Sequence, residues 1–242
     1  MKKFIKYGLL SVAALVIITF LGFYIWAQQT YKPTKQLTSL VGEVKIEDGW
    51  VIYEPKESKK TGVILYPGAK VEPEAYSYIA QQLSKQGYYV GIPEVTLNLA
   101  ITSINKAEEM MEKYPSVEKW YVGGHSLGGV SAGSFAYDNL DMVDGLFFLG
   151  SYPMNSNDFS ETHLPILSIY AERDGLTTLG DIEDSESLLS DETVLYEIKG
   201  GNHAQFGIYG PQKGDNEAEI SVKDQQDIIV DVLLKWLQGK KL

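Results

Sequence analysis

One serine, one aspartate and one histidine in this chain of 242 residues could together carry out nucleophilic chemistry. Ser126 lies in the pentapeptide GHSLG, and Asp174 and His203 follow it along the chain. A serine hydroxyl becomes a good nucleophile only when a base takes its proton, and the base needs an acid group that orients it. The three residue types are therefore those required for acyl transfer through a covalent intermediate.

The sequence on either side of Ser126 strengthens this interpretation, because a G-x-S-x-G match alone is weak. A predicted strand at 119–124 precedes the serine, and a predicted helix rich in small residues follows it. A serine at such a strand-to-helix turn has a strained backbone that exposes its hydroxyl. Bulky side chains two residues away would clash, so Gly124 and Gly128 fit the same turn.

The chain has only three histidines, and they are not equivalent. His125 adjoins the serine, but we expect it to point away from the solvent side of the turn and to be structural. His163 lies in a loop, and nothing pairs it with a nucleophile. His203 comes after the last predicted strand, between glycines in GGNHAQFG, and is the candidate base.

The candidate acid is Asp174, which follows the predicted strand at 165–171 and precedes a glycine. Three other carboxylates stay open as alternatives. Glu172 is two residues out of register with the position expected for the acid after the strand. Asp181 and Asp184 fall within the next predicted helix.

These residues depend on elements that alternate between strand-like and helix-like patterns. Such alternation predicts an α/β fold with a mostly parallel sheet and helices on both faces. Asp174 and His203 then project from the carboxyl edge of the sheet, where ligands bind in open α/β folds. Strands are predicted at 50–54, 62–68, 88–93, 119–124, 145–150, 165–171 and 193–200, and helices at 73–87, 97–115, 126–139, 177–190 and 221–237.

The strings GHSLGG, AERDGL and GGNHAQFGIYGPQKGD resemble the α/β-hydrolase superfamily. The last string resembles the α/β hydrolase fold-5 family, which is close to dienelactone-hydrolase-like esterases. The resemblance runs from about Gly62 to the C-terminus and implies the α/β-hydrolase fold, with Ser126 as nucleophile, His203 as base and Asp174 as acid. Dienelactone hydrolases themselves use cysteine at the nucleophile position, so their substrate is not carried over. The short link at 151–164 predicts a minimal lid or none.

Acyl transfer also needs hydrogen-bond donors for the developing oxyanion. In this type of fold one donor is the backbone N–H of the residue after the nucleophile, here Leu127. The second should come from the loop after the strand at 62–68. Ala69 follows Pro67 and Gly68 much as the donor follows His-Gly in many relatives, and Lys70 is the neighbouring possibility.

An N-terminal segment precedes the catalytic region. Residues Gly8–Ala27 carry no charge, and 20 residues span about 30 Å as a helix, the thickness of a hydrocarbon core. Lys2, Lys3 and Lys6 favour a cytoplasmic N-terminus. We therefore expect a single-pass signal anchor in the cell membrane, with the catalytic domain on the extracytoplasmic side. A cleaved signal peptide, and hence a secreted protein, is the alternative, although Ile25-Trp26-Ala27 is a poor cleavage site.

These predictions divide the chain into three regions. Residues 1–29 form the membrane anchor, with its helix at about 8–27. Residues 30–37 form a spacer, and residues 38–242 form one α/β-hydrolase domain.

Composition excludes several classes of function. The formal net charge of −11 should repel nucleic acids. The absence of cysteine excludes disulfides, a thiolate nucleophile and a cysteine-ligated metal. Asp181, Asp184 and Glu186 lack the ligand spacing and glycine of a calcium loop, so we expect a solvated acidic helix face and no metal. No cofactor is implied.

The leading hypothesis is a membrane-anchored serine hydrolase of the carboxylesterase type. It would cleave a small-molecule carboxylic ester, or a related acyl bond, through an acyl-enzyme. The alternatives are an acyltransferase that uses an acceptor other than water and a non-catalytic binding protein that retains the fold.

Overall fold

A seven-stranded sheet forms the centre of the computed structural model, which describes residues 2–242. The strand order is β1-β3-β2-β4-β5-β6-β7, and every neighbouring pair is parallel except β1 with β3. The prediction of a mostly parallel sheet is confirmed. The strands are β1 (Trp50–Tyr53), β2 (Thr61–Tyr66), β3 (Tyr88–Pro93), β4 (Lys119–His125), β5 (Gly145–Leu149), β6 (Ile166–Ala171) and β7 (Thr193–Ile198).

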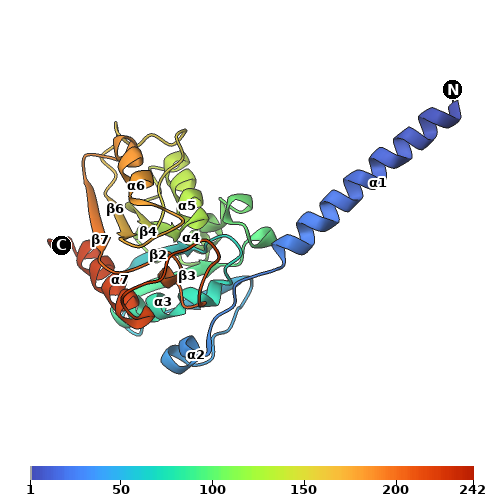
Figure 1. Cartoon of the computed structure of the whole chain (residues 1–242). Helices are drawn as coiled ribbons and strands as arrows, with labels where there is room; N and C mark the ends of the chain where they lie inside the picture. Colours follow the sequence, from blue (N-terminus) through green and yellow to red (C-terminus); the bar gives the residue numbers. More distant parts are fainter. Residues whose placement is uncertain (1) are drawn as a thin grey trace.

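Helices cover both faces of this sheet (Figure 1). One hydrophobic core contains side chains of α2, α3 and α7, and the other contains side chains of α4 and α5. The α-helices of the domain are α2 (Lys35–Val41), α3 (Ser77–Lys85), α4 (Lys106–Lys113), α5 (Leu127–Asp138), α6 (Leu179–Ser185) and α7 (Val222–Leu237). Five 3₁₀ turns complete the domain: η1 (Pro73–Tyr76), η2 (Thr96–Asn98), η3 (Ala100–Thr102), η4 (Glu186–Leu188) and η5 (Ala204–Phe206).

Strand β5 illustrates why the sheet is buried on both faces. All five of its residues are buried, and Phe147 and Phe148 belong to opposite hydrophobic cores. A side chain at Gly123 on the neighbouring strand would lie 2.3 Å from the Phe147 ring, so this glycine makes room for the aromatic residue. A sheet covered by helices on both faces requires such continuous apolar strands.

The helix predicted at 97–115 is shorter than expected. It begins only at Lys106, and the preceding residues form η2 and η3. Leu97 and Asn98 both have φ of 55°, in the left-handed region that a right-handed helix cannot contain. A further helix, α2, begins at Lys35 inside the predicted spacer.

Helix α1 (Lys2–Ala27) projects away from the domain as a single long rod (Figure 1). It is long and apolar enough to cross a membrane, a property that signal sequences share. Its apolar side chains from Phe4 to Trp26 are exposed, so the domain does not bury them. The segment between β5 and β6 contains turns but no helix within the described structure, in agreement with a minimal lid.

Candidate active site

Ser126 occupies a strained turn between β4 and α5. Its φ of 52° and ψ of −125° are rare for a residue with a side chain. A Cβ atom at Gly124 would lie 2.3 Å from the carbonyl carbon of Gly128, and one at Gly128 would lie 2.3 Å from the carbonyl oxygen of Tyr66. Only glycine fits at both positions, which is the steric reason for the motif around the serine.

Asp174 and His203 form a buried hydrogen-bonded pair. His203 Nδ1 lies 2.7 Å from Asp174 Oδ2, and neither side chain is exposed. The other carboxylate oxygen, Oδ1, accepts backbone N–H groups of Leu176 at 2.8 Å and Thr177 at 2.6 Å. Because Asp174 acts only as an acceptor, Nδ1 of His203 is the protonated nitrogen, and Nε2 is left as a base. Among the described residues Nε2 has no hydrogen-bond partner, although it is buried.

His125 connects the segment of Ser126 to the candidate base. Its ring centroid lies 4.4 Å from that of His203, and Ser126 is the next residue along the chain. The serine and the candidate base therefore come from segments that are in direct contact. The predicted structural position of His125 agrees with its complete burial, but its contact with His203 was not foreseen.

A hydrogen-bonded chain holds His125 in place. The Gly68 N–H donates to Tyr76 Oη at 2.9 Å, so the Tyr76 hydroxyl is free to donate to His125 Nδ1, also at 2.9 Å. Burial lowers the pKa of His125 well below its ordinary value, and the neighbouring His203 lowers it further. His125 is thus a neutral residue that connects the loop after β2 to the segment carrying the candidate base.

The loop after β2 also contains both candidates for the second oxyanion donor, Ala69 and Lys70. The Lys70 N–H is already used, because it donates to the Asn98 carbonyl at 2.7 Å. The Ala69 N–H makes no hydrogen bond with any described residue. Leu127 is the first residue of α5, where a backbone N–H has no partner within the helix.

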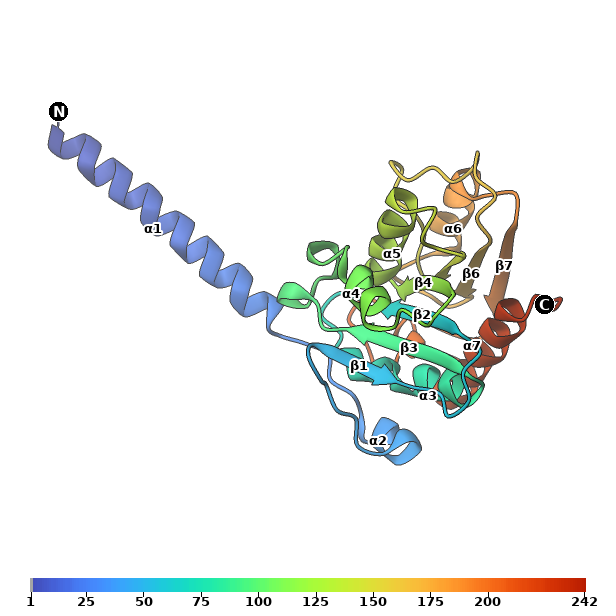
Figure 2. The ribbon, with the colours of Figure 1, turned by 180° about the vertical axis from the view of Figure 1, so that it is seen from behind.

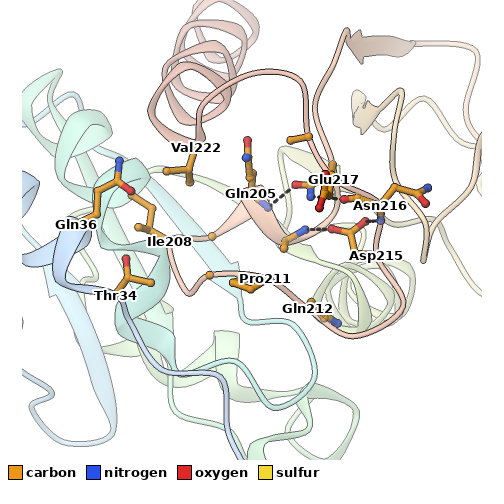
Figure 3. Close-up of a pocket in the computed structure, with 15 residues that line it drawn as sticks. Thr34, Gln36, Gln205, Ile208, Pro211, Gln212, Asp215, Asn216, Glu217 and Val222 are labelled. Carbon is orange, nitrogen blue, oxygen red and sulfur yellow. Dashed lines mark hydrogen bonds between the residues drawn. The ribbon is translucent and has the colours of Figure 1, made fainter.

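Asp215 is a site residue that the sequence analysis missed. Its carboxylate accepts N–H groups from Gly175 at 3.0 Å, His203 at 3.3 Å, Ala204 at 2.8 Å and Asn216 at 2.9 Å. Figure 3 shows this carboxylate at the turn that faces the segment after His203. Asp215 therefore joins the loop that carries the candidate acid to the loop that carries the candidate base. Its signal in the sequence is the last letter of GGNHAQFGIYGPQKGD.

The alternative acids and the third histidine lie elsewhere. Glu172 accepts the Gly200 N–H at 2.8 Å and lies 3.6 Å from the Lys199 ammonium. Asp181 accepts N–H and O–H groups of Thr178 in a capping box that begins α6. His163 is exposed and contacts Asp191 at 3.2 Å. Within residues 2–242, no group of three His, Cys, Asp or Glu side chains is arranged to hold a metal ion.

A cavity of about 430 Å³ has Asn202 and Ala204, the neighbours of His203 in sequence, in its lining (Figure 3). Ser126, Asp174 and His203 are not among the residues that line it. Its lining comes from two parts of the chain: Thr34 and Gln36, and then Asn202, Ala204, Gln205, Gly207, Ile208, Gly210, Pro211, Gln212, Asp215, Asn216, Glu217, Ala218 and Val222.

Comparisons with known proteins agree with the observed fold. A family model described as the alpha/beta hydrolase family matches residues 62–227. No curated protein sequence matches the chain.

Solved structures share the fold at low sequence identity. MGS-MChE2, an alpha/beta hydrolase enzyme from a sediment metagenome of the Mar Chica lagoon in Morocco, has a TM-score of 0.61 at 16% identity, over 81% of this chain and 98% of its own. Est1E from Butyrivibrio proteoclasticus has a TM-score of 0.60 at 14% identity, over 81% and 98%. An alpha-beta serine hydrolase homologue from Coxiella burnetii has a TM-score of 0.59 at 14% identity, over 80% and 98%.

Proposed function

The chain belongs to the alpha/beta hydrolase family, and from this premise we propose that it is a membrane-anchored serine hydrolase that cleaves carboxylic esters. Ser126 is the nucleophile, His203 the base and Asp174 the acid that orients it. The observation that carries the proposal is the buried Asp174–His203 hydrogen bond of 2.7 Å beside the strained turn of Ser126. Catalytic triads are recognised by this geometry and these roles rather than by sequence position.

The first half of the reaction transfers the acyl group to the enzyme. The Ser126 hydroxyl attacks the ester carbonyl carbon while His203 Nε2 takes the hydroxyl proton. The tetrahedral intermediate then collapses, its bond to the alkoxy oxygen breaks, and the imidazolium returns the proton to the departing alcohol. Asp174 stays ionised and stabilises the imidazolium, which is otherwise a buried, unpaired charge.

Backbone N–H groups stabilise the negative oxygen of the intermediate. The unpaired N–H of Ala69 and the first N–H of α5, that of Leu127, are the two donors we propose. The N-terminus of α5 adds the positive end of its dipole at the same place. Lys70 is not chosen, since its N–H already donates to Asn98.

The second half of the reaction restores the enzyme. Water attacks the acyl carbon while His203 takes one of its protons, and the bond to Ser126 Oγ breaks. The serine recovers its proton from the imidazolium, and the acyl group leaves as a carboxylic acid. No redox partner or cofactor is needed for this balance.

The N-terminal helix supports a location at the membrane. Helix α1 is exposed and apolar, and lysines precede its uncharged stretch. We propose that it anchors the protein in one pass and that the catalytic domain lies on the extracytoplasmic side. The alternative of a cleaved leader predicts a shortened mature chain, which intact-mass measurement of the cell-derived protein distinguishes.

A fluorophosphonate probe tests the nucleophile directly, using the full chain in detergent. We expect the wild type to be labelled at Ser126 and Ser126→Ala to remain unlabelled. Ser126→Ala and His203→Ala should also reduce hydrolysis of 4-nitrophenyl acetate by similar large factors, because a triad acts as a unit. Folded wild-type protein that resists the probe would contradict the proposal, and labelling that persists in Ser126→Ala would assign the nucleophile to another residue.

A further inference from the structure

The end of helix α1 is seated on the catalytic domain. Ala27, its last residue, is completely buried, and its carbonyl accepts a hydrogen bond from Asn98 Nδ2 at 3.0 Å. The Lys70 ammonium lies 4.4 Å from the centre of the Trp26 ring, within the range of a cation–π interaction. The anchor therefore contacts both the loop after β2 and the loop after β3.

The residues that follow the anchor continue these contacts. The Tyr31 N–H donates to the Lys70 carbonyl at 2.6 Å, and the Tyr31 carbonyl accepts the Glu72 N–H at 3.1 Å. A little further on, the Thr34 N–H donates to the Ile208 carbonyl at 3.0 Å, in the segment after the candidate base. Because backbone hydrogen bonds to the domain begin only a few residues after the helix, the segment between the anchor and the domain has little freedom to move.

All of these contacts lie on one edge of the sheet. The loops after β2, β3 and β7 begin where parallel strands end, and Ser126 follows β4 at the same edge. Strand β4 is the direct neighbour of β2. Figure 2 shows α1 leaving the domain on the side at which β2 ends. The membrane anchor and the nucleophile therefore share the carboxyl edge.

Exposed apolar side chains gather on that edge as well. Met154 follows β5, and Leu176 and Leu179 follow β6. Their exposed fractions are 37%, 39% and 37%, respectively. Apolar surface around the mouth of a site gains stability by leaving water, and a bilayer next to the site provides that environment.

From these contacts we infer that the Ser126 site opens onto the surface of the membrane that α1 spans, and that its substrates are amphipathic esters held in that membrane. The inference rests on the proposed function and adds a substrate class to it. The acyl chain or alcohol tail of such an ester stays in the bilayer while its ester group reaches Ser126 at the interface. Because α1 is packed against the domain, it keeps the site close to the bilayer surface. This raises the effective concentration of bilayer-held substrate at the site.

The test uses the full chain in phosphatidylcholine vesicles and two esters with the same leaving group. One is 4-nitrophenyl acetate, which is dissolved in water, and the other is 4-nitrophenyl palmitate, which is mixed into the bilayer. A variant carries 20 Gly/Ser residues between Ala27 and Gln28, enough for a mean reach of about 25 Å. We expect palmitate hydrolysis to fall about tenfold in this variant, while acetate hydrolysis stays within about twofold, since a flexible tether does not alter the reacting groups.

A matched pair of surface variants tests the orientation. Leu179→Gln alters the carboxyl edge, because Leu179 is the first residue of α6, the helix that follows β6. Leu140→Gln alters an equally apolar residue, 43% exposed, just after α5. Helix α5 begins at the carboxyl edge and runs toward the opposite one, so Leu140 should not face the bilayer. We expect Leu179→Gln to lower palmitate hydrolysis selectively and Leu140→Gln to leave both rates unchanged.

The outcomes separate this inference from the proposed function. Acetate hydrolysis combined with a palmitate rate that neither the linker nor Leu179→Gln changes would overturn the membrane-facing site and leave the hydrolase intact. Loss of both rates in the wild type, together with no fluorophosphonate labelling, would overturn the proposed function and the inference with it.

Discussion

The two ring nitrogens of His203 differ in their hydrogen bonding to Asp174. Its Nδ1 lies 2.7 Å from Asp174 Oδ2, while its Nε2 has no hydrogen-bond partner among residues 2–242. The carboxylate thus fixes both the tautomer and the orientation of the ring, and it leaves the basic nitrogen available for a hydroxyl group.

Asp174→Asn should lower kcat for 4-nitrophenyl acetate by about 10⁴-fold, since an amide favours the wrong tautomer of the base. Glu172→Gln is the matched control. Glu172 binds the Gly200 N–H and the Lys199 ammonium instead of a histidine, so its loss should leave kcat nearly unchanged. Steady-state kinetics of both variants decide the question. If Glu172→Gln is inactive and Asp174→Asn is active, the acid is Glu172.

Ala69→Pro should lower kcat by about 10²- to 10³-fold, because proline has no N–H to donate to an oxyanion. Ala69→Ser keeps the N–H and should retain activity. Thermal unfolding followed by circular dichroism checks that both variants are folded. Equal activity of the two folded variants would assign the second donor to another group.

Asp215→Asn should reduce kcat by about 10²-fold with little change in KM, since the loops of Asp174 and His203 lose the carboxylate that joins them and small displacements of reacting groups are costly. The rate of fluorophosphonate labelling should fall in parallel, because it depends on the same base. Glu217→Gln, an exposed neighbour in the same turn, is the control. A variant that loses thermal stability but keeps its kcat would limit Asp215 to a structural role.

The buried His125 should make stability depend on pH. Its native pKa is lowered, chiefly by burial, whereas in the unfolded chain it titrates near the ordinary value of about 6.5. The unfolded state then binds more protons below that pH. The free energy of unfolding should therefore fall by about 1.4 kcal/mol for each pH unit that the solution drops below about 6.5, until native His125 itself is protonated.

Urea unfolding between pH 5 and 7.5 measures this slope. His125→Gln should flatten it by the contribution of one proton, and His163→Gln should not, because the His163 side chain is 82% exposed. Parallel pH profiles for the wild type and His125→Gln would show that His125 does not carry the effect.

Local pattern is what made the fold class predictable. Short apolar strands alternate with amphipathic segments, and a sheet covered on both faces is the arrangement that buries them all. The strand-to-helix turn at Ser126 was also predictable, because the steric demand at Gly124 and Gly128 acts within a few residues of Ser126. The helix predicted at 97–115 failed for a different reason. Its apolar spacing begins at Leu97, but Leu97 and Asn98 both lie in the left-handed region, and hydrogen bonds to the distant Ala27 and Lys70 hold Asn98 there.

The sequence by itself determined the type of fold, the uncharged N-terminal segment and the short set of side chains that could react. Only the tertiary structure decided which of them meet. Asp174 and His203 are 29 residues apart, and Glu172 lies too close in sequence to Asp174 for pattern alone to exclude it. The hydrogen bonds of Asp215 and the contact of Ala27 with Asn98 are likewise long-range. Such contacts depend on how strands and loops pack in space, and they leave no periodic signal in the sequence.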